Sequence, residues 1–173
     1  ALIPEAYIAA AEAAADAAGA VIRPLFRSAL LVEAKGDASP VTRADKEAEE
    51  AIRALIAERF PDHGVIGEEH GADRPDAEWV WVVDPIDGTR AFVTGRPLFG
   101  SLVGLLHQGR PVLGIIDQPV TGERWLGAAG RPTARPPAPR RPRPASRPGR
   151  DGRCVRWRPP ARPCAVRQRL APF

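Results

Sequence analysis

The character of the sequence changes abruptly at Arg131, and this break limits the part of the chain that can fold. Residues 131–173 contain 13 Arg, 11 Pro, 6 Ala and 2 Gly among 43 residues, with a single acid, Asp151. A segment of this composition has no hydrophobic periodicity with which to build a core. We therefore expect a folded part over residues 1–130 and a disordered Arg/Pro-rich tail over residues 131–173. The tail is either a basic arm or linker, or the product of a shifted reading frame in a GC-rich gene. We favour the shifted frame because the break falls inside a foldable sheet.

The charge of the chain divides at the same point. The whole chain has a formal net charge of +4, whereas residues 1–130 hold 12 basic and 20 acidic residues and therefore carry −8. An acidic body argues against a nucleic-acid-binding face there. The arginines of the tail leave open a non-enzymatic module whose basic arm binds nucleic acid or an acidic partner, although the tail offers only Trp157 and Phe173 for stacking on bases.

The two cysteines and the first residues of the chain bear on its location. Cys154 and Cys164 both lie in the tail with no histidine after them, so they predict neither a zinc site nor a disulfide framework. The Ala-rich opening contains Glu5, Glu12 and Asp16 and lacks a basic leader, so it resembles neither a secretory signal nor a membrane span. We expect a cytoplasmic protein with no membrane partner.

Two segments have apolar residues at helical spacing, and the rest of the folded part reads as strands. Helices are predicted over residues 4–27 and from about Thr42 to Phe60, with a hairpin or ordered loop over residues 30–41 between them. Strands are predicted at residues 65–67, 79–83, 98–107, 111–118 and 123–126. Helices followed by antiparallel strands predict an α+β fold in which two helices pack on an antiparallel sheet.

Three acids stand at the ends of predicted strands. Glu68 follows Val65-Ile66-Gly67, Asp84 follows the apolar run 79–83, and Asp87 comes three residues later. Hard divalent cations prefer oxygen ligands, and strand ends are rigid supports beside solvent. Asp84 could bridge two ions, Asp87 could hold one and Glu68 could complete the other, so that the ions polarise a phosphate and activate a bound water. Taken singly, the Glu pair is typical of a solvated loop and the Asp-Pro-Ile-Asp-Gly segment of a turn with side-chain caps.

Asp45 and Thr89 form a second candidate pair with an equally simple structural interpretation. The spacing Thr42-x-x-Asp45 fits a helix capping box, and Thr89, after Gly88, stands at the expected start of a short helix whose free N–H groups favour a phosphate. If Asp45 and Thr89 meet in space, they can take a proton from an attacking water. Lys35 would ordinarily be a surface residue, and the three histidines are expected to have structural or solvated roles.

The order of these motifs resembles the signature of the inositol monophosphatase family. The resemblance is carried by Gly67-Glu68-Glu69 and by the run from Trp81 to Thr89, and it covers about residues 5–130, roughly the first half of a family member. It implies that Mg²⁺ is held by Glu68, Asp84, the Ile86 carbonyl and Asp87. It further implies that Asp45 and Thr89 orient the nucleophilic water, with Glu68 completing the catalytic set, and that Lys35, Gly88 and Thr89 bind the phosphate.

Within this family, the run from Arg90 to Gly100 is most similar to the histidinol-phosphate phosphatase branch, as are residues 116–119 and 122–125. The resemblance thus implies a magnesium-dependent phosphatase of a small phosphorylated alcohol, histidinol phosphate in histidine biosynthesis, with inositol phosphate or a related sugar phosphate as the alternative. It also allows a homodimer.

The sequence departs from the family pattern after Gly130. Family members carry a Trp-Asp-x-Ala-Ala type motif downstream whose aspartate completes the second metal site, whereas here Trp157 is followed by Arg158. A catalytically inactive, truncated fragment is therefore a further alternative, with apolar surface left uncovered.

Overall fold

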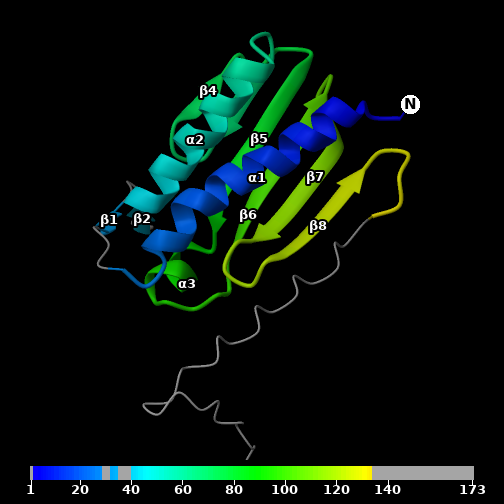
Figure 1. Cartoon of the computed structure of the whole chain (residues 1–173). Helices are drawn as coiled ribbons and strands as arrows, with labels where there is room; N and C mark the ends of the chain where they lie inside the picture. The colour runs from blue at the N-terminus through cyan, green and yellow to red at the C-terminus, as the bar shows by residue number, and fades with distance from the viewer. Residues whose placement is uncertain (1, 29–31, 35–39, 134–173) are drawn as a thin grey trace, which may run out of the picture. The chain divides into compact units, whose positions relative to one another are not determined.

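In the computed structural model, described for residues 2–28, 32–34 and 40–133, two helices lie on one face of a six-stranded sheet (Figure 1). Helix α1 (Glu5–Leu25) and helix α2 (Arg43–Arg59) pack against each other, α1 over strands β6 and β7 and α2 over β5. This arrangement confirms the α+β class and both predicted helices. The division at residue 130 and the disorder of the tail stay predictions, because residues 134–173 lie outside the described residues.

The first helix packs closely because its buried face is made of small residues. Ala11, Ala14, Ala15 and Ala18 are fully buried in α1 and let its backbone approach α2 and the sheet, while Ile22 fills the space one turn later. None of the described helices is long and apolar enough to cross a membrane.

A small hairpin precedes the second helix, as expected from the segment between the helices. Strands β1 (Val32–Ala34) and β2 (Pro40–Thr42) pair antiparallel, and Thr42 then caps α2. Lys35, predicted to bind phosphate, lies between these strands and outside the described residues.

The large sheet has the order β4-β3-β5-β6-β7-β8. Its strands are β3 (Gly64–Gly67), β4 (Gly71–Asp73), β5 (Trp79–Asp87), β6 (Gly100–His107), β7 (Arg110–Gln118) and β8 (Glu123–Ala128). All five predicted strands are present. The β6–β7 turn has positive φ at both Gln108 and Gly109, the combination that a two-residue hairpin favours.

The expectation of a purely antiparallel sheet is wrong at one pair, because β3 and β5 run parallel. The short strand β4 pairs antiparallel with the outer edge of β3. Residues 74–78 then return the chain to the end of the sheet at which β3 begins. This return passes the first residue of β3 so closely that a Cβ on Gly64 would overlap the carbonyl oxygen of Arg74. Strand β4 was not predicted, since its three residues are all exposed and leave no apolar pattern.

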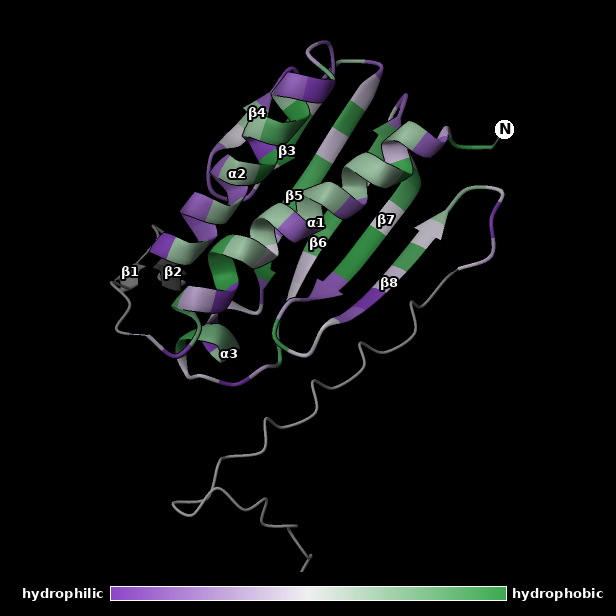
Figure 2. Ribbon diagram, viewed as in Figure 1, coloured by the Kyte–Doolittle hydropathy of each residue, from purple (hydrophilic) through white to green (hydrophobic). Residues whose placement is uncertain are grey.

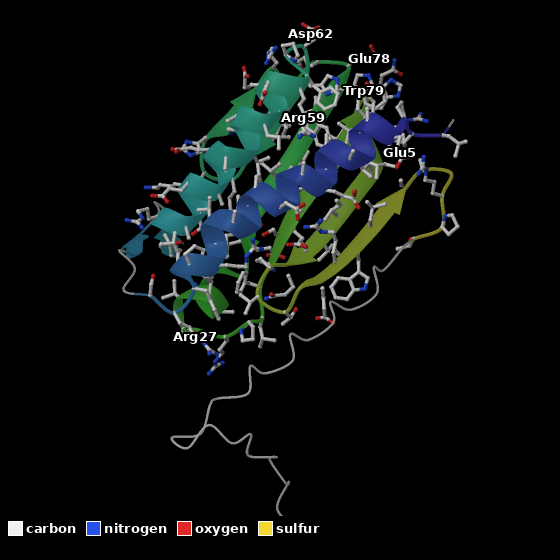
Figure 3. All side chains as sticks on the ribbon, viewed as in Figure 1. Glu5, Arg27, Arg59, Asp62, Glu78 and Trp79 are labelled. Atoms are coloured by element: carbon white, nitrogen blue, oxygen red, sulfur yellow. The ribbon has the colours of Figure 1, made fainter. Side chains whose placement is uncertain are left out.

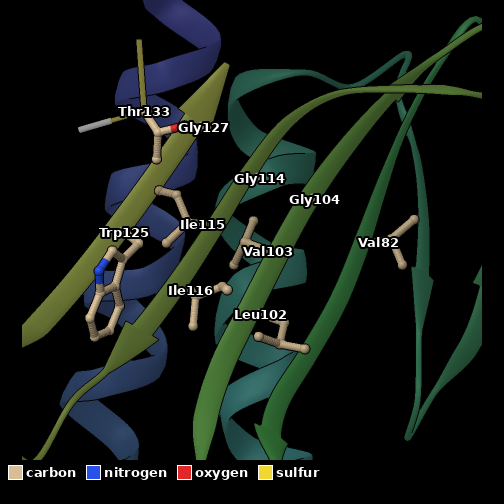
Figure 4. A pocket seen from close by; sticks show the side chains of 10 residues that line it. All are labelled: Val82, Leu102, Val103, Gly104, Gly114, Ile115, Ile116, Trp125, Gly127 and Thr133. Carbon is tan, nitrogen blue, oxygen red and sulfur yellow. The ribbon is translucent and has the colours of Figure 1, made fainter. Parts of the chain in front are cut away.

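The core lies between the helices and the sheet, whose central strands are rich in apolar residues (Figure 2). Trp81, Val83, Val103 and Leu105 are buried toward the helices, whereas the intervening Val82 is 38% exposed. A shallow groove of about 470 Å³ runs over β5–β8 and is lined by side chains that include those of Val82, Leu102, Ile116 and Trp125 (Figure 4). Val82, Ile116 and Trp125 are 36–54% exposed on this face, which we call the outer face.

Candidate active site

The predicted metal ligands converge because β3 and β5 run parallel. In this pairing Gly67 lies opposite Val83, so Glu68, the first residue after β3, comes beside Asp84, the next residue of β5. Their carboxyl groups share a hydrogen bond, and Asp87 lies near enough to act on Asp84 electrostatically. Three acids that are separated by up to 19 residues in the sequence thus meet at the end of β5 that leads into α3 (Thr89–Val93) (Figure 1).

A bulge in β5 presents Asp84 and Asp87 at this end. Asp84 pairs with Leu102 and Asp87 with Gly100, so three steps along β5 face two steps along β6. Pro85 occupies the bulge, where its missing N–H leaves no unpaired donor. The buried hydroxyl of Ser101 donates a 2.7 Å hydrogen bond to the Pro85 carbonyl. The bulge is therefore held by a side chain on the neighbouring strand.

Asp84 is a partly buried carboxylate beside two other acids. Burial, the charges of Glu68 and Asp87, and the hydrogen bond with Glu68 together raise the pKa of Asp84 to about 7. Its Oδ1 atom is buried and has no hydrogen-bond partner among the described residues. A buried carboxylate oxygen without a donor costs free energy, which a bound cation would recover.

The oxygen donors of these acids are of the type that a hard divalent cation prefers, although the acids do not form a complete metal site. The orphaned Asp84 Oδ1, the adjoining carboxylates of Glu68 and Asp87, and the Ile86 carbonyl are all oxygen donors of the kind that Mg²⁺ prefers. Within residues 2–28, 32–34 and 40–133, however, no three His, Cys, Asp or Glu side chains stand together in the geometry of a metal site.

Gly88 turns the chain from the bulge into α3. Its φ of 98° is one that favours glycine, and a Cβ there would lie 3.0 Å from the Leu98 carbonyl oxygen. Thr89 begins α3 as predicted, and its hydroxyl donates a 3.2 Å hydrogen bond to the Ile86 carbonyl. The roles of Gly88 and Thr89 in phosphate binding stay predictions.

Asp45 forms the predicted capping box. Its carboxylate accepts hydrogen bonds from the backbone N–H and the hydroxyl of Thr42 at 2.8 Å and 2.6 Å, and its own N–H donates to that hydroxyl. Strand β2, which leads into α2 through Thr42, packs beside α3, the helix that Thr89 begins. The proton relay between them stays a prediction.

The histidines contact other parts of the molecule, as expected. His63 accepts a hydrogen bond from the Trp81 indole and stacks on Phe60, and burial lowers its pKa. His107 pairs with Glu78 and stacks on Trp79, at the end of β5 far from α3 (Figure 3).

Two residues at this site were not identified from the sequence. Ser101 lies in a strand and gives no local sign of its contact with Pro85. Glu49 is fully buried and accepts hydrogen bonds from the loop that carries Glu68. A signal for Glu49 did exist, because a charged residue between Ala48 and Ile52 falls on the apolar face of α2.

An open cavity of about 530 Å³ adjoins the acids. Its lining is apolar, with Phe99, Leu102 and Trp125 among its residues, except for the side chains of Asp87 and Gln118. The Gln118 amide donates to the carbonyls of Pro97 and Phe99 and so fixes the loop between α3 and β6.

Comparison with known proteins assigns the chain to a family. A model of the inositol monophosphatase family matches residues 4–143. The chain belongs to this family of phosphatases. Among curated proteins it is 50% identical over 129 residues to the "Bifunctional phosphatase IMPL2, chloroplastic" of Arabidopsis thaliana, covering 73% of this chain and 37% of that protein. It is 40% identical over 120 residues to a histidinol-phosphatase of Mycobacterium tuberculosis, covering 69% and 46% of the two chains.

Solved structures of the family have the same fold as this chain. An inositol monophosphatase from Zymomonas mobilis superposes with a TM-score of 0.66 at 50% identity, covering 76% of this chain and 51% of that one. The chain spans about half of the length of the relatives that it matches, or less.

Proposed function

We propose that this chain forms the metal-binding half of a magnesium-dependent phosphomonoesterase that acts on a small phosphorylated alcohol. The observation that carries the proposal is the meeting of Glu68, Asp84 and Asp87, with one buried oxygen of Asp84 left without a donor. Bound Mg²⁺ would supply Lewis-acid polarisation of the phosphate and an activated water. Glu68, Asp84, Asp87 and the Ile86 carbonyl would hold it.

The remaining residues would position the reacting groups. Thr89 presents its hydroxyl beside the Ile86 carbonyl, and Asp45, fixed by Thr42, would accept a proton from the attacking water together with Thr89. Gly88, Thr89 and Lys35 would bind the phosphate. The cavity beside Asp87 has the volume typical of small-molecule sites and would accept the organic part of the substrate.

We further propose histidinol phosphate as the substrate, with inositol phosphate as the alternative. The first is supported by the run from Arg90 to Gly100 and by relatives named histidinol-phosphatase at 40% and 42% identity. The second is supported by the inositol monophosphatase structures that share the fold. A cytoplasmic location belongs to the same proposal.

The test is phosphate release by the purified 173-residue chain, with histidinol phosphate and inositol 1-phosphate compared at equal concentration, with Mg²⁺ or with EDTA. We expect Mg²⁺-dependent release that is faster with histidinol phosphate and that is lost in Asp84→Asn. Asp76→Asn, an exposed acid away from the site, is the matched control. Mg²⁺ binding without hydrolysis of either substrate would contradict the activity and favour the inactive-fragment alternative.

A further inference from the structure

Helix α2 carries a carboxylate that has no exposure to solvent at all. Glu49 is 0% exposed, and its oxygens accept hydrogen bonds from the backbone N–H groups of Glu69 at 2.7 Å and His70 at 3.1 Å. Arg53, one turn later, donates to it at 2.8 Å. A buried charge is retained only where such donors replace water. These contacts therefore determine the position of the segment that supplies the donors.

That segment is the turn between β3 and β4, which contains the predicted metal ligand Glu68. The residue before the turn, Gly67, lies against the Glu49 carboxylate, and a Cβ there would overlap it. The residue after the turn, Gly71, accepts a hydrogen bond from Arg53 through its carbonyl. Glu68 thus stands in a turn that Glu49 and Arg53 fix on both sides.

Glu68 is exposed in this turn, so its placement depends on the backbone of the turn. Glu49 fixes that backbone, since the N–H groups that it binds belong to the two residues directly after Glu68. The turn is therefore held by contacts within the protein.

We propose that Glu49 is a positioning residue that holds the Glu68 turn in place for cation binding, without itself touching the ion or the substrate. The proposal rests on the proposed function for its consequence in metal affinity. The contacts by which it acts are testable in the metal-free chain.

The experiment compares Glu49→Gln with Glu47→Gln in the full 173-residue chain. Both variants remove one negative charge from α2. The side chain of Glu47, however, is 45% exposed and forms an ion pair with Arg43. Amide hydrogen exchange of Glu69 and His70 is measured in EDTA, and the Mg²⁺ dissociation constant by titration calorimetry. We expect Glu49→Gln to raise exchange at both amides at least tenfold and to weaken Mg²⁺ binding about 10- to 100-fold. Glu47→Gln should leave both quantities unchanged.

The two readouts separate the positioning role from the function. Unchanged exchange at both amides in a folded Glu49→Gln variant overturns the inference, as does unchanged Mg²⁺ affinity. If the unaltered chain binds no Mg²⁺, the proposed function fails, while the exchange data still decide whether Glu49 holds the turn. If Glu49→Gln does not fold, Gly67→Ala replaces it, because the added methyl displaces the carboxylate and leaves its charge in place. Protected Glu69 and His70 amides in that variant would then refute the role of Glu49.

Discussion

The free energy of unfolding should depend on the protonation of Asp84. In the folded chain Asp84 titrates near pH 7, compared with 3.8 for an unperturbed aspartate. The folded state therefore binds this proton more tightly than the unfolded state does. Stability from this group is complete below about pH 3.8 and is lost as the pH rises through 7.

The magnitude follows from the displacement of the pKa. Taken in full, it corresponds to about 4 kcal/mol of lost stability above pH 7. Because the Asp84 carboxyl is only partly buried, solvent screening reduces this value, and we expect about 2 kcal/mol. Asp84→Asn removes the ionisation and keeps the shape. In EDTA it should match the unaltered chain near pH 4 and exceed its stability by about 2 kcal/mol at pH 8.

The assay is urea unfolding between pH 4 and 8 in EDTA, with Asp76→Asn as the exposed control. Asp117 also has a pKa raised by burial, and the pKa of His63 is lowered by burial, but both contributions are common to all three proteins and cancel in the difference. Saturating Mg²⁺ should reverse the order of the variants at pH 8, since only the carboxylate binds the ion. A stability difference that does not vary with pH, or that has the opposite sign in EDTA, would refute the burial and charge repulsion assigned to Asp84.

Three further perturbations follow from the same structure. Mg²⁺ at 10 to 100 times its dissociation constant should stabilise the chain by about 1.4–2.7 kcal/mol, seen as a rise in melting temperature that EDTA abolishes. Ser101→Ala should cost about 1–3 kcal/mol in urea unfolding, because it leaves the Pro85 carbonyl without its donor, whereas Ser28→Ala, at an exposed position, should cost little. Ile116→Thr should reduce light scattering at unchanged stability, because Ile116 is 54% exposed on the outer face. The neighbouring Ile115→Thr, at 2% exposure, should destabilise instead. Equal effects of the two isoleucine substitutions would contradict the assignment of the faces.

Features encoded by short-range patterns were predicted correctly from the sequence. The capping box joins Thr42 to Asp45 three residues apart, and β5 is marked by its apolar run 79–83. The strand continues past that run, so Asp87 stands at its end whereas Asp84, predicted to end the strand, lies within it.

Features that depend on distant contacts were not visible in the sequence. The parallel pairing of β3 with β5 depends on the exposed strand β4 and on the return past Gly64, neither of which has a hydrophobic period. The bulge at Pro85 requires Ser101 from the next strand, and the role of Glu49 appears only when residue 69 folds back onto residue 49. Contacts between residues so far apart in the sequence follow no fixed spacing, so no sequence pattern reveals them.

Helix α2 contributes Asp45 in its first turn and Glu49 one turn later, about 6 Å further along the helix axis. Neither acid can shift relative to the other without bending the helix. A substitution elsewhere in the protein that shifts α2 as a body therefore displaces both the proposed proton acceptor and the carboxylate that holds the Glu68 turn.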